Sequence, residues 1–203
     1  MLHRFALILA ALLLPAAAAA AQATTNVVIE TELGNIVVEL ETERAPVSAA
    51  NFLRYADEKR FDGIVFYRAM RLDWGDQPNG LVQAGTQWDP KRILPPIVHE
   101  PTDATGVRHV AGAISMARLE PGTATGDFSI LVSDQPGLDA DPRSEDPELR
   151  AGYAAFGRVV EGMDVVRAIF AAPTDPDKGE GFMKGQMLAE PVKVIRVRRQ
   201  EPA

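Results

Sequence analysis

The strongest constraint on the fold is a succession of short β-rich runs separated by turn residues. These runs occupy 26–41, 64–70, 81–84, 110–117, 127–132, 153–160 and 192–200. The first run is divided at Leu33-Gly34-Asn35, a hairpin signal that makes two strands of it. A chain with about eight short strands is expected to be all-β dominated and to form a closed or nearly closed antiparallel barrel. A β-sandwich is the alternative that the pattern alone leaves open.

Helical periodicity is found at only two places. After Pro46, which suits a first helical turn, apolar residues recur at a spacing of three to four as far as Ala56. A second, shorter helix is predicted over 162–172, and the two helices are expected to cover the open ends of the barrel. The acidic segment 134–152 and the Gly/Asp/Lys-rich segment 174–190 are predicted to be loops.

The first 23 residues predict a cleaved secretory signal peptide, which leaves a single domain over 24–203. A basic start with His3 and Arg4 precedes an apolar run from Phe5 to Leu14, and small residues suited to cleavage follow. The run is too short for a membrane-spanning helix, which needs about 20 apolar residues. We therefore expect an exported protein of the bacterial periplasm, with no membrane association after signal removal.

The composition of the chain argues against several kinds of partner. The sequence contains no cysteine, so no disulfide framework exists and an exported domain must rely on its core. The formal charge of −7 becomes −8 when Arg4 is removed with the signal peptide. An acidic chain without a basic cluster argues against nucleic acid and against anionic membrane surfaces. The basic segment 192–200 is interpreted as a solvated strand edge.

Neither metal nor nucleophilic chemistry is predicted, and no cofactor is expected. The chain has no cysteine and no G-x-S-x-G motif. His99 and His109 are the only histidines after the signal peptide, and His99 beside Glu100 is interpreted as surface hydrogen bonding. The acidic residues of 139–146 lack the glycine and the oxygen spacing of a calcium loop, so they are interpreted as solvated.

Two polar residues interrupt runs that otherwise look like barrel or sandwich interior. These are Arg68 and Gln83. Strict alternation would place Phe66, Arg68 and Met70 on one face of a strand, and both faces around the arginine are apolar. Two interpretations stay open from the pattern alone. Both side chains lie at a sheet margin, where loop carbonyls satisfy them, or both belong to a functional site.

Several motifs resemble those of the cyclophilin family of peptidyl-prolyl cis-trans isomerases. They read FYR, QAG, ISMAR, GDFSI, GLD and YAAFGRVVEGMDVV, and the resemblance extends over about 26–198. It implies a closed eight-stranded antiparallel β-barrel capped by two α-helices. It also implies a peptidyl-prolyl cis-trans isomerase that acts on X–Pro bonds of exported proteins and assists their folding.

The resemblance also implies a role for each matching residue. The family's catalytic arginine falls on Arg68, which would donate a hydrogen bond to the imide nitrogen of the twisted transition state. The family's glutamine, which helps to hold the substrate carbonyl and the arginine, falls on Gln83. The other substrate-binding positions fall on Leu81, Ala117, Ser129, Leu138 and Tyr153. No metal is implied.

The pocket for proline departs from the family pattern. The positions that are aromatic in the family are occupied here by Ser129, by Gly137 and, depending on a one-residue gap, by Gly80 or Leu81. Asp127 stands where the family has glutamine. A buried Phe-to-small change costs about 3–5 kcal/mol. If each missing wall costs about a third of that, proline binding is expected to weaken more than tenfold. Cyclosporin binding, which the resemblance links to the aromatic at position 137, is expected to be weak.

These departures leave two functions open. The first is a prolyl isomerase of reduced activity, whose partners are proline-containing segments of exported proteins. In that case Leu72 and Trp74, in the long segment 71–80, are expected to refill the pocket. The second is a cyclophilin-like module that holds extended peptides or a partner protein, as a chaperone does, without appreciable turnover. A monomer is expected in either case.

Overall fold

The computed structural model describes residues 23–200, so 1–22 of the predicted signal peptide lie outside the described residues. The strands are β1 (Thr25–Thr31), β2 (Gly34–Leu40), β3 (Val65–Arg71), β4 (Gly80–Gly85), β5 (Ala113–Met116), β6 (Phe128–Leu131), β7 (Ala154–Glu161) and β8 (Met187–Arg199). The helices are α1 (Pro46–Asp57), α2 (Thr102–Thr105), α3 (Pro147–Ala151) and α4 (Met163–Ala171), and short 3-10 turns cover Pro136–Leu138 and Gly181–Met183.

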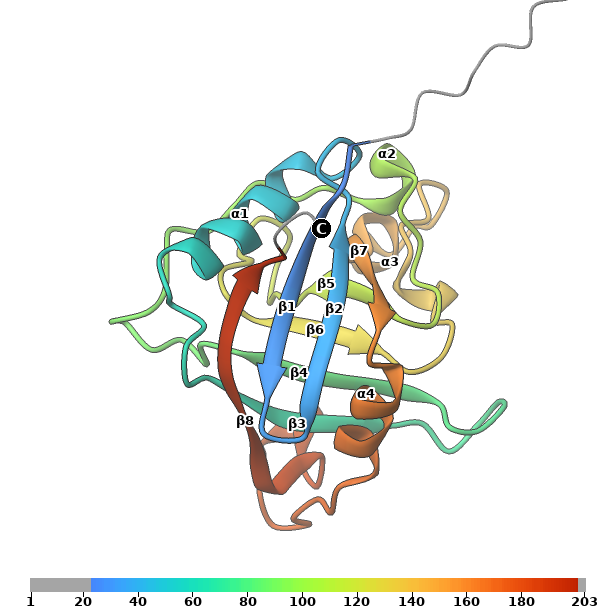
Figure 1. Cartoon of the computed structure of the whole chain (residues 1–203). Coiled ribbons are helices and arrows are strands. Elements are labelled where there is room, and N and C mark those ends of the chain that lie inside the picture. The colour runs from blue at the N-terminus through green and yellow to red at the C-terminus, as the bar shows by residue number, and fades with distance from the viewer. Residues whose placement is uncertain (1–22, 201–203) are drawn as a thin grey trace, which may run out of the picture.

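The eight strands form one closed barrel (Figure 1). Neighbouring strands are antiparallel in the order β1-β2-β7-β5-β6-β4-β3-β8, and β8 returns to pair with β1. The predicted closed eight-stranded barrel is therefore confirmed, and the sandwich alternative is excluded. Closure pairs each strand on both sides, so the barrel formed by residues 23–200 has no free edge strand.

An aromatic cluster beneath α1 forms the centre of the core. The ring centroid of Phe52 lies 4.8 Å from that of Phe61, 5.2 Å from Phe128 and 5.6 Å from Phe156. Helix α1 covers one end of the barrel and α4 covers the opposite end, as predicted (Figure 1). Because side chains fill the interior of the barrel, a substrate can bind only to its outer surface.

The loop before α2 supplies the cap of α1. The carboxylate of Glu100 accepts hydrogen bonds from the backbone N–H groups of Val47 (3.0 Å) and Ser48 (2.6 Å), and from the hydroxyl of Ser48 (2.7 Å). A negative charge at this end counters the helix dipole. His99 and Glu100 each form hydrogen bonds as predicted, but not with each other. Nε2 of His99 lies 2.9 Å from the carbonyl oxygen of Ala151.

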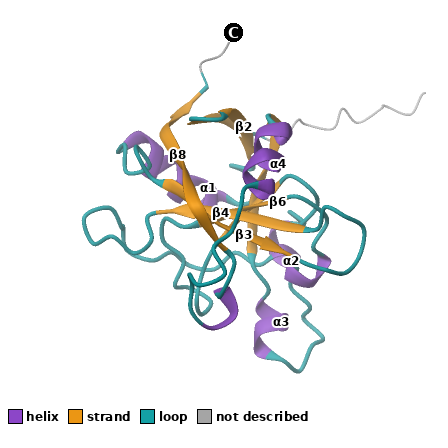
Figure 2. Ribbon diagram, turned by 90° about the horizontal axis from the view of Figure 1, so that it is seen from below, coloured by secondary structure: helices purple, strands orange, loops and turns teal. Residues whose placement is uncertain are grey.

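The acidic segment 134–152 is not the featureless loop that its composition predicts. It contains α3, which lies away from the strands in Figure 2. The carboxylate of Asp146 accepts a hydrogen bond from the backbone N–H of Glu148 at 2.8 Å and caps this helix. Within residues 23–200, no group of three or more acidic, histidine or cysteine side chains is placed to hold a metal ion. In the same part of the chain, no helix has the length and apolarity to cross a membrane.

Strand β8 begins at Met187, five residues earlier than predicted. Its pairing with β3 is interrupted, and this interruption hides its first residues in the sequence pattern. Phe66 of β3 pairs with Val192, but Arg68 pairs with Met187, so 188–191 form an excursion opposite a single residue of β3. Proline at 191 has no N–H to donate to a ladder, which suits an interruption and hides the strand in the sequence pattern.

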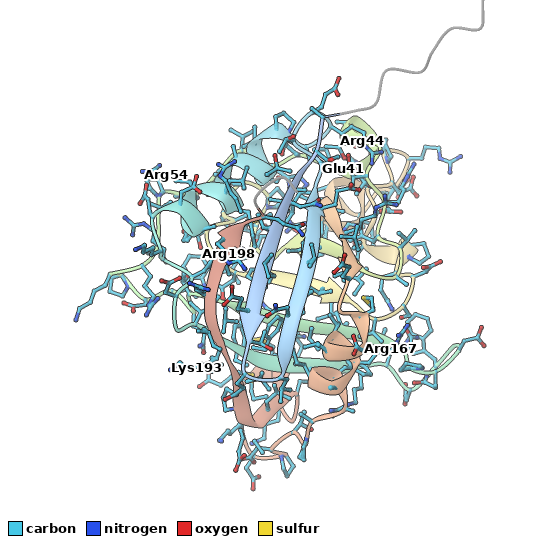
Figure 3. All side chains as sticks on the ribbon, in the orientation of Figure 1. Glu41, Arg44, Arg54, Arg167, Lys193 and Arg198 are labelled. Carbon is cyan, nitrogen blue, oxygen red and sulfur yellow. The ribbon has the colours of Figure 1, made fainter. Side chains whose placement is uncertain are left out.

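Strand β8 is also not the strand edge that its basic residues predict. It pairs with β1 on one side and with β3 on the other. Its charged side chains do lie in solvent as predicted, and Lys193 and Arg198 point away from the barrel in Figure 3. Arg196 and Arg198 both donate to the carboxylate of Glu30, at 2.8 and 2.7 Å.

Candidate active site

A β-bulge in β3 determines the direction in which Arg68 points. Arg68 pairs with Gln83 and Phe66 pairs with the next residue of β4, so Tyr67 is an extra residue without a partner in that strand. Phe66 and Ala69 pack in the hydrophobic core, whereas the guanidinium of Arg68, although buried, bonds to two side-chain amides. The predicted alternation, which put Phe66 and Arg68 on one face, is therefore wrong. The bulge shifts the pattern by one residue and turns Arg68 toward the outer surface.

The side chain of Tyr67 fixes this bulge to Asp127, the residue directly before β6. Its hydroxyl donates a hydrogen bond to the carboxylate of Asp127 at 2.9 Å, and the hydroxyl of Thr86 donates to the same carboxylate at 3.1 Å. Burial raises the pKa of Asp127, an effect that these hydrogen bonds oppose. Asp127 therefore anchors the strand that presents the arginine.

Two side-chain amides hold the guanidinium of Arg68. Its Nη1 donates to Oε1 of Gln83 at 2.8 Å, and its Nε and Nη2 donate to Oε1 of Gln186 at 2.9 and 2.6 Å. Loop carbonyls, the acceptors of the sheet-margin interpretation, are not among these partners. Burial lowers the pKa of Arg68, an effect that Tyr67 and Tyr153 oppose, and a guanidinium keeps its charge at neutral pH.

Gln83 begins a row of buried polar residues on the outward face of the barrel wall. It lies opposite Ser129 in β6, which in turn lies opposite Ser115 in β5. Leu81 faces the same side of β4 as Gln83 because it is two residues earlier in the strand. The structure thus brings four of the predicted site residues, including Arg68, onto one patch of the surface.

The three other predicted site residues lie outside the strands. The backbone N–H of Tyr153 donates to the carbonyl of Leu138 at 2.8 Å, and that of Ala117 donates to the carbonyl of Asp127 at 2.9 Å. The electrostatic effect of Tyr153 on Arg68 is to raise the pKa, against the lowering by burial. Ala117 follows directly after β5.

Three residues of this region are not among those assigned to the site from the sequence. Gln186 is one, and Phe182 is another, with its ring centroid 5.5 Å from Cζ of Arg68. Both come from the predicted loop 174–190, and their only signal is an amide and an aromatic ring within a Gly-rich, charged stretch. The third is Arg118, whose Cζ lies 4.4 Å from the ring centroid of Tyr153. Its place in the ISMAR motif could have revealed it.

The positions that lack an aromatic wall differ in the room around them. A Cβ atom at Gly80 would lie 1.9 Å from the carbonyl oxygen of Met70, and the backbone φ of Gly80 is +140°. Only glycine fits there, so Leu81 is the residue of this segment that can form a wall. A Cβ atom at Gly137 would meet nothing within 4 Å. The side of the site at Gly137 is therefore open.

Comparison with known proteins decides the family. The model of the family described as "Cyclophilin type peptidyl-prolyl cis-trans isomerase/CLD" matches residues 26–198. The chain belongs to the cyclophilin family. A peptidyl-prolyl cis-trans isomerase of Acinetobacter baylyi is 37% identical over 201 residues, which cover 97% of this chain and 95% of that protein. Peptidyl-prolyl cis-trans isomerase A of Dickeya dadantii is 35% identical over 156 residues, 75% of this chain and 74% of that protein.

A solved structure supports the same fold. The crystal structure of a cyclophilin type isomerase from Cryptosporidium parvum matches with a TM-score of 0.67 at 18% identity, covering 89% of this chain and 100% of the other. The resemblance inferred from the motifs is confirmed, and membership of the cyclophilin family supports peptidyl-prolyl cis-trans isomerase activity. The roles of Arg68 and of the six predicted substrate-binding residues stay predictions.

Side-chain to backbone hydrogen bonds within the segment stabilise the long connection between β3 and β4 of this cyclophilin. Nε2 of Gln77 donates to the carbonyl oxygens of Leu72 and Trp74, each at 3.1 Å, and Nδ2 of Asn79 donates to that of Trp74 at 2.6 Å. The side chain of Trp74 is 62% exposed. The ring is thus not packed as a wall within the chain. Refilling of the pocket by Leu72 and Trp74 stays a prediction.

A buried Ser–His–Asp arrangement extends the polar row of the cyclophilin barrel. Nε2 of His109 lies 2.9 Å from Oγ of Ser115, and Nδ1 lies 2.8 Å from Oδ1 of Asp139. Ser115 is 3% exposed and His109 is 1% exposed. A substrate cannot reach this serine, so the arrangement is structural and not hydrolytic. Burial lowers the pKa of His109, and Asp139 opposes this effect.

The lowered pKa of His109 predicts a loss of stability in acid. The unfolded chain takes up a proton near pH 6.5 that the folded cyclophilin refuses, so this contribution is complete above pH 6.5 and falls as the pH drops below it. The slope is at most about 1.4 kcal/mol per pH unit. Urea unfolding between pH 7.5 and 5 measures it, with His109→Gln as the matched variant. Equal pH dependence of the two proteins would contradict the prediction.

Proposed function

We propose that this cyclophilin catalyses cis–trans isomerisation of X–Pro bonds in exported proteins, with Arg68 stabilising the twisted imide of the transition state. The observation that carries the proposal is the state of the Arg68 guanidinium. It is oriented by two neutral amides, and no carboxylate of residues 23–200 lies within salt-bridge distance of it. Its positive charge is therefore not neutralised by a carboxylate, and the 7% of the residue that is exposed lies where a substrate would approach the outward face of β3.

The chemistry of the X–Pro bond explains what such an arginine contributes. The barrier to rotation is about 18–20 kcal/mol because amide resonance must be broken. In the twisted state the imide nitrogen becomes pyramidal and basic, so it can accept a hydrogen bond that the planar ground state cannot. A donor used only in the transition state raises the rate rather than the affinity. One charge-assisted hydrogen bond is worth about 1.5–3 kcal/mol, or roughly 10–100-fold.

The rest of the acceleration depends on gripping proline beside Arg68. We assign this task to Leu81, Ser129, Leu138 and Tyr153, with Ala117 at the margin and Gln83 holding both the arginine and the substrate carbonyl. The location of Leu81 and Ser129 on one patch with Gln83 supports this assignment. We also propose a periplasmic location and a monomer, which rest on the N-terminal sequence pattern and on the closed barrel.

The second candidate function is a peptide-holding module with little turnover. The open side at Gly137 and the small side chain at Ser129 favour it, because both leave the proline ring with few contacts. Such a module would bind extended segments of exported proteins through backbone hydrogen bonds and release them unchanged.

Exchange spectroscopy on an Ala-Pro peptide separates the two functions. In NMR, an isomerase broadens or exchanges the separate cis and trans signals of the peptide, since it speeds a process that otherwise takes tens of seconds. A module that only binds shifts the signals without exchanging them. Signals that stay unexchanged at protein concentrations near that of the peptide would contradict the isomerase proposal and favour the module.

A further inference from the structure

The segment 174–186, between α4 and β8, lies against the catalytic arginine although the proposed mechanism makes no use of it. The backbone carbonyl of Gln186 accepts a hydrogen bond from the N–H of Ala69, the residue after Arg68, at 2.9 Å. The backbone N–H of Gln186 donates to the carbonyl of Met183 at 3.0 Å. Gln186 is therefore fixed by main-chain bonds on both sides, next to the bulge that presents the arginine.

The side chain of Gln186 has one orientation that satisfies all its neighbours. Its Nε2 donates to the carbonyl oxygen of Phe182 at 2.8 Å, and this carbonyl can only accept. The amide oxygen must then face the other way, where it accepts from Nε and Nη2 of Arg68 at 2.9 and 2.6 Å. Side-on contact by a single oxygen with two N–H groups fixes the plane of the guanidinium.

A count of donors shows what this contact leaves free. A guanidinium has five N–H groups. Gln186 accepts from two and Gln83 accepts from one, so two have no acceptor within residues 23–200. Gln83 accepts from Nη1, whereas Gln186 accepts from Nε and Nη2. One N–H group of Nη1 and one of Nη2 therefore stay free of acceptors in this part of the chain. Gln186 thus holds the guanidinium and leaves these two hydrogens for a substrate.

The neutrality of Gln186 matters as much as its geometry. A carboxylate in the same place would accept the same two hydrogen bonds and would hold the arginine more tightly. It would also cancel the positive charge that is meant for the imide nitrogen of the substrate. The ring of Phe182 adds to this arrangement, since its face attracts a cation without neutralising it, 5.5 Å from Cζ of Arg68.

We propose that Gln186 is a second positioning residue for Arg68, which together with Gln83 clamps the guanidinium in the orientation needed by the twisted imide. The inference rests on the proposed function, because it concerns the residue that carries the isomerisation. It makes the segment before β8 part of the active site. A loss of Gln186 leaves Arg68 charged but free to rotate about its last torsions, which lowers the fraction of productive geometry.

The first test measures the arginine itself and needs no activity. The Nε–H proton of Arg68 gives an NMR signal that can be assigned by its loss in Arg68→Lys. In the wild type this proton is expected to exchange slowly with water, because it is bonded to Gln186. Gln186→Leu is expected to speed the exchange at least about tenfold, whereas Gln186→Glu keeps it slow. Gln200→Leu, at an exposed glutamine after the same strand, is the matched control and should leave it unchanged.

The second test measures turnover on an Ala-Pro peptide. Gln186→Leu is expected to lower kcat about tenfold with little change in KM, because the geometry is lost and the binding surface is kept. Gln186→Glu is expected to lower kcat as well, although it keeps the arginine in place, because it cancels the charge. Circular dichroism at the assay temperature confirms that both variants are folded.

The outcomes distinguish this inference from the function on which it rests. Acceleration by the wild type that Gln186→Leu leaves unchanged overturns the positioning role alone. An unchanged exchange rate of the Arg68 Nε–H in Gln186→Leu overturns it too, whatever the activity. A rise in KM at constant kcat also contradicts it, because that pattern indicates a substrate contact. No acceleration by the wild type overturns the proposed function itself.

Discussion

Replacing Arg68 with alanine is expected to lower kcat for isomerisation by roughly 10–100-fold, with little change in the affinity for a proline peptide. The hydrogen bond from the guanidinium to the imide nitrogen exists only in the twisted state, so its loss affects turnover and not binding. The upper part of the range is expected, because the buried amide oxygen of Gln83 and the partly buried amide oxygen of Gln186 also lose their donor and rearrange within the site.

Arg68→Lys separates charge from geometry in the same assay. Lysine keeps a positive charge, but a single ammonium cannot reproduce the planar fork that meets both amides. We therefore expect it to recover only a small part of the activity. Arg198→Ala, at an exposed arginine that pairs with Glu30 on β8, is the matched control and should be as active as the wild type. Equal kcat in wild type and Arg68→Ala would rule out the role assigned to Arg68.

The barrel could be predicted from the sequence because its signals are local. Turn residues delimit the strands, and the hairpin at Leu33-Gly34-Asn35 is found as the pairing of β1 with β2. The two capping helices follow from apolar spacing in the same way. Strand ends are less local. The predicted strand 110–117 shortens to Ala113–Met116, and the backbone N–H of Ala111 donates to the carboxylate of Asp134 and not to a neighbouring strand.

The site could be predicted only as far as its motifs extend. Arg68 and Gln83 stand out as polar residues in apolar runs, and their pairing across β3 and β4 agrees with that prediction. The bulge at Tyr67 has no sequence signal, since both faces of the strand around Arg68 carry apolar residues and either register satisfies the pattern. Gln186 lies 118 residues from Arg68 in the chain, so only the interrupted pairing of β8 with β3 brings them together. Contacts of this kind depend on strand register and not on local pattern.

Rebuilding the missing aromatic wall is expected to raise the affinity for a proline peptide, whereas removal of the arginine lowers turnover. Gly137→Trp combined with Ser129→Phe should tighten the binding of a proline peptide more than tenfold, if each ring restores about a third of the value of a buried aromatic. The first substitution meets no obstacle at its Cβ atom, because a Cβ atom at Gly137 has nothing within 4 Å. Ser129 lies opposite Gln83, so a phenylalanine there would project beside the arginine.

The pattern of kinetic changes tests whether proline binds where we place it. A wall contacts the proline ring in the ground state and in the transition state alike, so the double variant should lower KM and leave kcat nearly unchanged. Gly137→Ala, which adds a methyl group without a ring, is the matched control and should behave as the wild type. The resemblance to cyclophilins also predicts that Gly137→Trp raises the affinity for cyclosporin. If neither peptide nor cyclosporin binds more tightly, the substrate does not pass between Ser129 and Gly137, and the proline pocket must lie elsewhere on the patch around Arg68.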